Sequence, residues 1–196
     1  MSREIEYEKR VLINEDQYKK ILRFFLKKYP DYKSFKQTNY YFDTCSFDLK
    51  NKGIVFRLRK TKKEYPILTL KIKGSNGDLE INQVLTSKEK KCILNNIEIP
   101  EGEIKDYLSH EGLLINSLHL LGLLKTKRME IKFDDFLIVL DKNEYLETCD
   151  YNLEIEANSI KRAESIILEL CGFFALEYKK DYSSKSNRLF KLLEKK

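Results

Sequence analysis

Charged and apolar residues alternate strictly at the start of the chain. The charged ones occupy every second position: Glu4, Glu6, Glu8 and Arg10. Ile5 and Tyr7 lie between them. Because successive side chains of a β-strand point to opposite faces, this pattern predicts a strand with one ionic and one apolar face.

An amphipathic helix is predicted to follow this strand. Its apolar residues recur at helical spacing: Tyr18, Ile21, Leu22, Phe25 and Leu26. Asn14 and Gln17 have the spacing of a capping box at its start, and Pro30 ends it. Similar patterns predict helices over residues 86–94, 104–109, 115–123, 160–170 and 184–194. Gly172 has the position of a helix C-cap after the fourth of these.

Further segments are short and rich in β-forming residues: 39–43, 53–60, 65–73, 79–85, 125–133, 136–140 and 151–157. Asp134 and Asp135 form a predicted hairpin turn between two of them. Several connections are short, which favours antiparallel pairing. These elements indicate an α+β fold in one domain, residues 1–196, whose eight strands could close into an antiparallel β-barrel.

Composition narrows the class of protein. Hydrophobic residues form 42% of the 196 residues, which is enough for a folded core. No apolar run approaches the roughly 18 residues of a membrane-spanning helix, and the charged N-terminus is unlike a signal peptide. The four cysteines lie far apart, and two histidines offer little for a zinc site. We therefore expect a cytoplasmic protein without a membrane partner.

Like charges are grouped strand by strand. Glutamates alternate near both ends of the chain, and basic residues alternate between them: Arg57 with Arg59, Lys71 with Lys73, then Arg128 beside Glu130. One interpretation places these ionic faces in solvent, as in many half-buried strands. The other turns them into a barrel lumen, where grouped like charges need a partner of opposite sign. A divalent cation and a polyphosphate would together satisfy both groups.

Five motifs resemble the CYTH superfamily, the triphosphate tunnel metalloenzymes. They follow the family's order: Glu6-Tyr7-Glu8-Lys9-Arg10, Asn39-Tyr40-Tyr41-Phe42-Asp43-Thr44, Arg57-Leu58-Arg59, Leu68-Thr69-Leu70-Lys71 and Leu153-Glu154-Ile155-Glu156. The overall layout is most similar to small bacterial CYTH proteins. Arg10 departs from the family pattern, which has lysine there. Arginine keeps the positive charge but cannot give up a proton.

The resemblance implies an eight-stranded antiparallel barrel whose tunnel binds a triphosphate with Mg²⁺ or Mn²⁺. The implied metal ligands are acidic: Glu4, Glu6, Glu8, Glu80, Asp141, Glu154 and Glu156. The implied substrate contacts are basic: Arg10, Arg57, Arg59, Lys71, Arg128, Lys185 and Arg188. Lys71, Glu8 and Tyr41 are the implied catalytic residues, because a tyrosine in this motif pairs with the matching lysine of thiamine triphosphatases.

These residues favour a metal-dependent hydrolase of a small triphosphate, such as inorganic tripolyphosphate or thiamine triphosphate. The first alternative is a class IV adenylate cyclase, although no base-recognition pocket can be identified. The second is a non-catalytic polyphosphate- or nucleotide-binding protein, to which paired carboxylates would bring no advantage. Nucleic acid is not an expected partner, since basic and acidic residues alternate along the chain. The sequence leaves a homodimer open.

Overall fold

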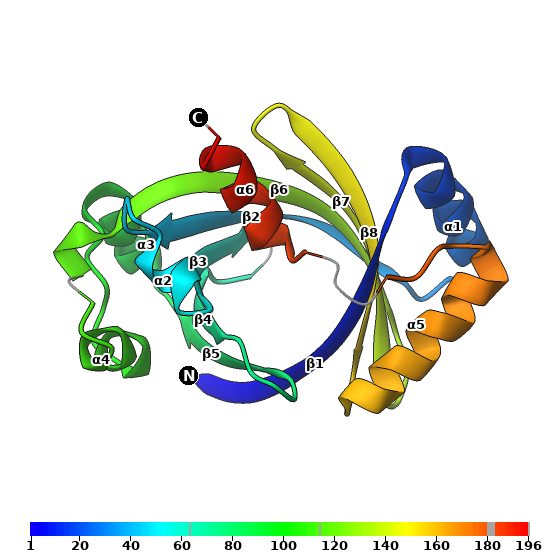
Figure 1. The fold of residues 1–196 in the computed structure, drawn as a ribbon, viewed down its shortest axis with the longest axis horizontal. Helices are drawn as coiled ribbons and strands as arrows, with labels where there is room; N and C mark the ends of the chain where they lie inside the picture. The colour runs from blue at the N-terminus through cyan, green and yellow to red at the C-terminus, as the bar shows by residue number, and fades with distance from the viewer. Residues whose placement is uncertain (63, 114, 180–182, 196) are drawn as a thin grey trace.

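The computed structural model describes residues 1–62, 64–113, 115–179 and 183–195. Within them, eight antiparallel strands form a closed barrel in the order β1-β5-β4-β3-β2-β6-β7-β8 (Figure 1). The strands are β1 (Ser2–Ile13), β2 (Lys33–Asp43), β3 (Ile54–Thr61), β4 (Ile67–Ile72), β5 (Asp78–Val84), β6 (His119–Lys132), β7 (Phe136–Tyr145) and β8 (Thr148–Ala157). The predicted α+β fold with an eight-stranded antiparallel barrel is confirmed.

Strand β1 closes the barrel because its two halves pair with different strands. Residues 2–6 pair with β5, and residues 7–13 pair with β8. This register sets Glu4 opposite Glu80 and Glu8 opposite Glu156. Directly opposed residues share one face of a sheet, so the alternating glutamates of three strands point to the same side.

Two groups of helices cover the outside of the barrel. α1 (Glu15–Lys28) and α5 (Ile160–Phe174) pack over β1 and β8, around buried Val11 and Ile167. α2 (Asp48–Asn51), α3 (Ser87–Asn96) and α4 (Glu103–His110) enclose a second core with the apolar faces of β3, β4 and β5 (Figure 1). Each fully buried Leu, Ile or Phe contributes about 1.5–3 kcal/mol. The apolar strand faces therefore point outward beneath helices.

The start of α1 follows the predicted capping box. The Asn14 side chain accepts the backbone N–H of Gln17 at 2.9 Å, and the Gln17 side chain accepts the backbone N–H of Asn14 at 2.9 Å. Two backbone donors that the helix cannot satisfy are thereby paired. Among the helices of the described residues, none has the length and apolar character needed to cross a membrane.

The prediction of a helix over residues 115–123 was wrong. Only Ile115–Ser117 form a short 3-10 helix, and β6 begins at His119. The inward face of early β6 is apolar because α6 (Lys185–Leu193) enters this end of the barrel and packs Leu189 and Phe190 against Leu124. Without inward polar residues the strand loses its alternation, and a short apolar run is ambiguous between helix and strand.

Gly172 does not end α5, as its position had indicated. The helix continues to Phe174, and Ala175 takes the left-handed C-cap conformation with φ 55°. A left-handed alanine costs roughly 1–2 kcal/mol. The buried ring of Phe174 offsets that cost, since it packs edge-on against Phe24 and Phe25 with centroids 5.3 and 5.8 Å away.

Candidate active site

The ionic strand faces line a cavity of about 1200 Å³ inside the barrel. Glu154 is 1% exposed, and it borders this cavity together with Glu6 and Arg57. The inward orientation is therefore confirmed over the solvated one. Most of the expected site residues contribute to the lining: Glu4, Glu6, Glu8, Arg10, Tyr41, Arg57, Arg59, Lys71, Glu80, Arg128, Glu154, Glu156 and Lys185.

Three carboxylates converge where β1 crosses from β5 to β8. These are the side chains of Glu6, Glu8 and Glu156, here called the carboxylate trio. One oxygen atom from each lies within 4.8 Å of the other two. Burial raises the pKa of Glu156 to about 7; Arg128 opposes the shift, whereas the charges of Glu6 and Glu154 add to it. A site that resists holding its own negative charges is suited to a cation. Carboxylate oxygens are the ligands that Mg²⁺ and Mn²⁺ prefer.

The ammonium of Lys71 lies beside the carboxylate trio. It forms an ion pair with Glu6, lies 3.3 Å from Asp78, and lies 3.8 and 3.9 Å from Glu8 and Glu80. Burial raises the pKa of Glu6, but the charges of Lys71 and Arg57 outweigh it, and the net pKa lies below its usual value. Lys71 thus supplies the positive charge that these glutamates require.

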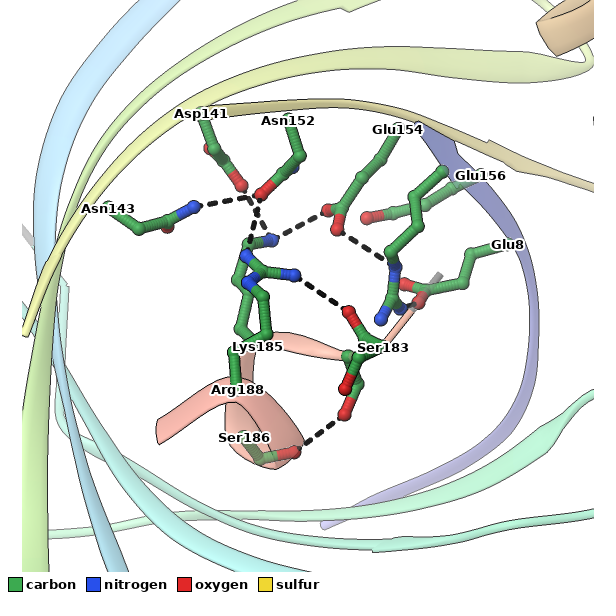
Figure 2. A network of polar contacts seen from close by, with 12 residues as sticks. Glu8, Asp141, Asn143, Asn152, Glu154, Glu156, Ser183, Lys185, Ser186 and Arg188 are labelled. Carbon is green, nitrogen blue, oxygen red and sulfur yellow. Dashed lines mark hydrogen bonds and ion pairs between the residues drawn. The ribbon is translucent and has the colours of Figure 1, made fainter. Parts of the chain in front are cut away.

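Asp141 and Glu154 belong to a separate cluster, which Figure 2 shows around the N-terminus of α6. Lys185 of α6 lies 2.7 Å from a carboxylate oxygen of each. Arg128 donates to Asp141 at 3.0 and 2.8 Å, and Arg10 lies 3.2 Å from Glu154. Burial raises the pKa of Glu154, yet the three neighbouring cations hold it well below its usual range. These two carboxylates orient basic side chains in the structure and lie outside the carboxylate trio.

The two arginines of β3 differ in their partners. Arg57 donates to Glu80 at 3.2 Å. Arg59 donates its Nε to the Asn39 side chain at 3.1 Å, and no described carboxylate lies within ion-pair distance of it. Burial and the charges of Arg57 and Arg128 lower the pKa of Arg59 to about 10. A half-buried guanidinium that has no described acidic partner is a ready contact for an anionic ligand.

Arg10 takes part in the site despite replacing the family's lysine. It forms ion pairs with Glu8 and Glu154, the latter at 3.2 Å. The register places it directly opposite Glu154. Its fork-shaped guanidinium therefore spans the carboxylate trio and the Asp141–Glu154 cluster, which a single ammonium would not do as well.

Four other expected residues are placed as follows. Glu4 is exposed at the rim of the cavity, and its carboxylate accepts a hydrogen bond from Asn82 Nδ2 at 3.3 Å. Glu80 is only 7% exposed and faces inward. Tyr41 borders the cavity, but its ring packs on Phe190 and its described contacts do not include Lys71. Arg188 does not border the cavity. Its Nε and Nη2 instead donate hydrogen bonds to the carboxylate of Asp150 at 2.7 and 3.0 Å.

The sequence did not identify the polar network that holds α6 in place. The carboxylate of Asp150 accepts hydrogen bonds from the side chains of Arg188, Asn143 and Tyr145. The side-chain oxygen of Asn152 accepts a hydrogen bond from Asn143 at 2.8 Å. Burial and the hydrogen bond to Asp150 raise the pKa of Tyr145 to about 12. The sequence could have indicated that these residues point inward, because they share the strand parity of Asp141 or Glu154. It could not have indicated that they pair with α6.

The barrel, its ionic lumen and the order of its motifs agree with comparisons to known proteins. The family model of the CYTH domain matches residues 4–187. The chain belongs to the CYTH family. "Putative triphosphatase YjbK" of Bacillus subtilis (strain 168) is 32% identical over 199 residues, covering 100% of this chain and 98% of that protein.

Two solved structures show the same fold. A Bacillus halodurans protein described as a putative adenylate cyclase has a TM-score of 0.88 at 30% identity, covering 97% of this chain and all of that one. A Hippeastrum protein, described as a putative adenylyl cyclase with a dominant triphosphatase activity, has a TM-score of 0.77 at 20% identity, with 95% of each chain covered. At 20% identity, the second likeness concerns the fold alone.

Proposed function

We propose that this CYTH protein is a metal-dependent triphosphatase that hydrolyses a small triphosphate, such as inorganic tripolyphosphate or thiamine triphosphate. One observation carries the proposal: the carboxylate trio and the guanidinium of Arg59, which has no described acidic partner, face the same cavity. A cation site and an anion site sharing a lumen match the two halves of a metal–triphosphate complex.

The carboxylate trio fits a divalent cation by its donor chemistry. Glu6, Glu8 and Glu156 would hold the ion, either Mg²⁺ or Mn²⁺, through oxygen atoms. Such an ion would neutralise phosphate oxygens and lower the pKa of water at the site. Lys71 pairs with Glu6 in the structure and lies at the edge of the trio, so its ammonium could turn from the glutamates toward a phosphate.

The basic residues would bind the triphosphate and stabilise the charge that develops during transfer. Arg128 is buried, and Arg57 and Arg59 are half-buried. The charges of these three guanidiniums act on one another, and an anion among them would relieve their repulsion. Lys185 reaches the lumen from α6. The attacking group would be water, so no covalent protein intermediate is required.

Among the relatives of at least 30% identity, the names cover both reactions. YjbK, 32% identical over 199 residues, carries the name of a triphosphatase and supports hydrolysis, whereas the Bacillus halodurans protein carries the name of an adenylate cyclase. The adenylate cyclase alternative rests on the same cavity, with the ribose hydroxyl replacing water as nucleophile. A binding protein without catalysis would not need three converging carboxylates, one of which, Glu156, has a pKa raised to about 7.

One assay separates these functions. Purified protein is incubated with tripolyphosphate, thiamine triphosphate or ATP, each with Mg²⁺, Mn²⁺ or EDTA. Orthophosphate release from tripolyphosphate or thiamine triphosphate that stops in EDTA supports the proposal. Cyclic AMP from ATP would establish the cyclase, and tight binding of a triphosphate without turnover would establish the binding protein.

A further inference from the structure

The two groups of helices leave part of the barrel's outer wall uncovered, over β2, β6 and the end of β3 at Lys60 (Figure 1). The outward side chains there include four lysines, Lys36, Lys60, Lys125 and Lys127, here called the lysine wall. All four are exposed. The outward faces of the other strands carry mainly apolar residues that pack beneath helices.

Strand register brings these lysines together from three segments of the chain. Lys36 lies directly opposite Lys127, which lies opposite Lys142 on β7. In the next row, Thr38 is flanked by Lys60 on one side and Lys125 on the other. Neighbouring strands are about 4.8 Å apart, and like charges directly opposite one another destabilise a sheet. The arrangement therefore has an energetic cost within the folded protein alone.

Acidic neighbours do little to offset that cost. Glu144 lies opposite Lys125 but pairs with Lys142 at 3.2 Å. Across the described residues, no carboxylate forms an ion pair with any lysine of the wall. A surface that served only solubility would intersperse both signs of charge. The wall is thus complementary to a ligand with several negative charges.

The alternation of charges along the chain argued against a nucleic-acid partner, but the strand register gathers lysines of three segments on one face. We propose that the lysine wall binds the phosphodiester backbone of double-stranded nucleic acid without reading its sequence. Lysine contacts a phosphate as a point charge, and such contacts supply most non-specific binding to duplexes. Single-stranded binding instead depends on aromatic platforms for the bases. The outward neighbours on the same strands are Thr38, Tyr40 and Leu123, and the one aromatic among them is partly buried against the core.

This surface is separate from the cavity, so it adds a partner to the proposed triphosphatase and does not depend on its activity. Four lysines neutralising four phosphates predict a slope of log affinity against log salt of about −3.6. The dissociation constant expected for non-specific binding is about 10⁻⁴–10⁻⁶ M at physiological salt. Replacing two of the lysines should bring the slope to about −1.8.

The test measures fluorescence anisotropy of a short labelled DNA duplex titrated with the full chain in EDTA, across a series of salt concentrations. The informative variant is Lys36→Gln with Lys127→Gln, and the matched control is Lys88→Gln with Lys91→Gln, two exposed lysines of α3. We expect the first pair to halve the slope and the control pair to leave it nearly unchanged. Thermal unfolding should show the first variant at least as stable as the wild type, because repulsion is relieved.

Three results would overturn the proposal: an unchanged slope in the Lys36/Lys127 variant, an equal loss in the α3 control, or no duplex binding at low salt. Vesicles containing anionic lipid and inorganic polyphosphate are run in parallel. Binding to either of these, with none to the duplex, would assign the wall to that ligand and also refute the proposal. An Arg59→Gln variant should retain duplex binding, which separates the wall from the cavity.

Discussion

Arg128 on β6 donates Nε and Nη2 to the two carboxylate oxygens of Asp141, directly opposite on β7, at 3.0 and 2.8 Å. Asp141 is fully buried and also lies 2.7 Å from Lys185. This carboxylate thus fixes one guanidinium and one ammonium that face the cavity. A bidentate pair of this kind imposes orientation as well as charge balance.

Replacing Asp141 with asparagine tests whether it orients the basic residues or binds metal. We expect Asp141→Asn to lower the free energy of unfolding by about 1.5–3 kcal/mol, because Arg128 loses its bidentate partner while Glu154 still pairs with both Arg128 and Lys185. Mn²⁺ affinity should change little, since Asp141 lies outside the carboxylate trio. Urea unfolding and Mn²⁺ titration calorimetry measure the two effects. A loss of Mn²⁺ affinity of a hundredfold or more would return Asp141 to the metal site.

The carboxylate trio should be required for turnover but not for folding. The double variant Glu6→Gln with Glu8→Gln is expected to abolish metal-dependent phosphate release. It should remain folded because Lys71 keeps Asp78 and Arg10 keeps Glu154 as acidic partners. Circular dichroism and phosphate release are measured together. Glu4→Gln, which changes a rim glutamate of the same strand, is the control; equal activity in the double variant and the control would refute the assignment.

Cation binding should weaken as the pH falls below about 7. Metal binding needs Glu156 ionised, and its pKa is raised to about 7 in the folded protein. The affinity for Mn²⁺ should then fall by about tenfold per pH unit below that value. Titrations from pH 8 to about 5 measure this trend. A flat profile would show that no proton leaves the site when the ion binds.

The same group should affect the stability of the metal-free protein in the opposite sense. Between its ordinary pKa of 4.5 and about 7, the folded state holds a proton that the unfolded state has lost. The contribution of Glu156 to the free energy of unfolding is therefore present at low pH and is lost as the pH rises through this window. Glu156→Gln should remove that part of the pH dependence in urea unfolding measured in EDTA. Identical slopes for both proteins would contradict it.

Arg59 should matter for the ligand and little for the fold. Arg59→Gln removes a guanidinium that lacks a described acidic partner, so the free energy of unfolding should stay the same or rise. Loss of a charge-assisted hydrogen bond of about 1.5–3 kcal/mol predicts tripolyphosphate binding weaker by about 10–150-fold. Calorimetry with Mn²⁺ and thermal unfolding measure both. Arg162→Gln, an exposed arginine of α5 that pairs with Asp135, is the matched control.

Much of the site could be predicted because β-strands report the orientation of their residues. Parity alone put Glu6 and Glu8 on one face of β1, Arg57 and Arg59 on one face of β3, and the motif order identified the family. Parity does not say which residues of different strands meet. The register between β1 and β8, which lie nearly 150 residues apart in the chain, places Glu156 beside Glu6 and Glu8. The same register places Glu154 beside Arg10 and Lys185 instead.

The sequence by itself determined the alternating strands, the sign of charge on each and the family to which they belong, since these depend on local spacing. The tertiary structure alone decided that β1 pairs with both β5 and β8, that α6 enters the lumen and packs on the apolar start of β6, and that Lys36, Lys60, Lys125 and Lys127 share one outer wall. Each of these results from contacts between distant segments. Their free energy depends on closing the barrel, and no local pattern encodes it.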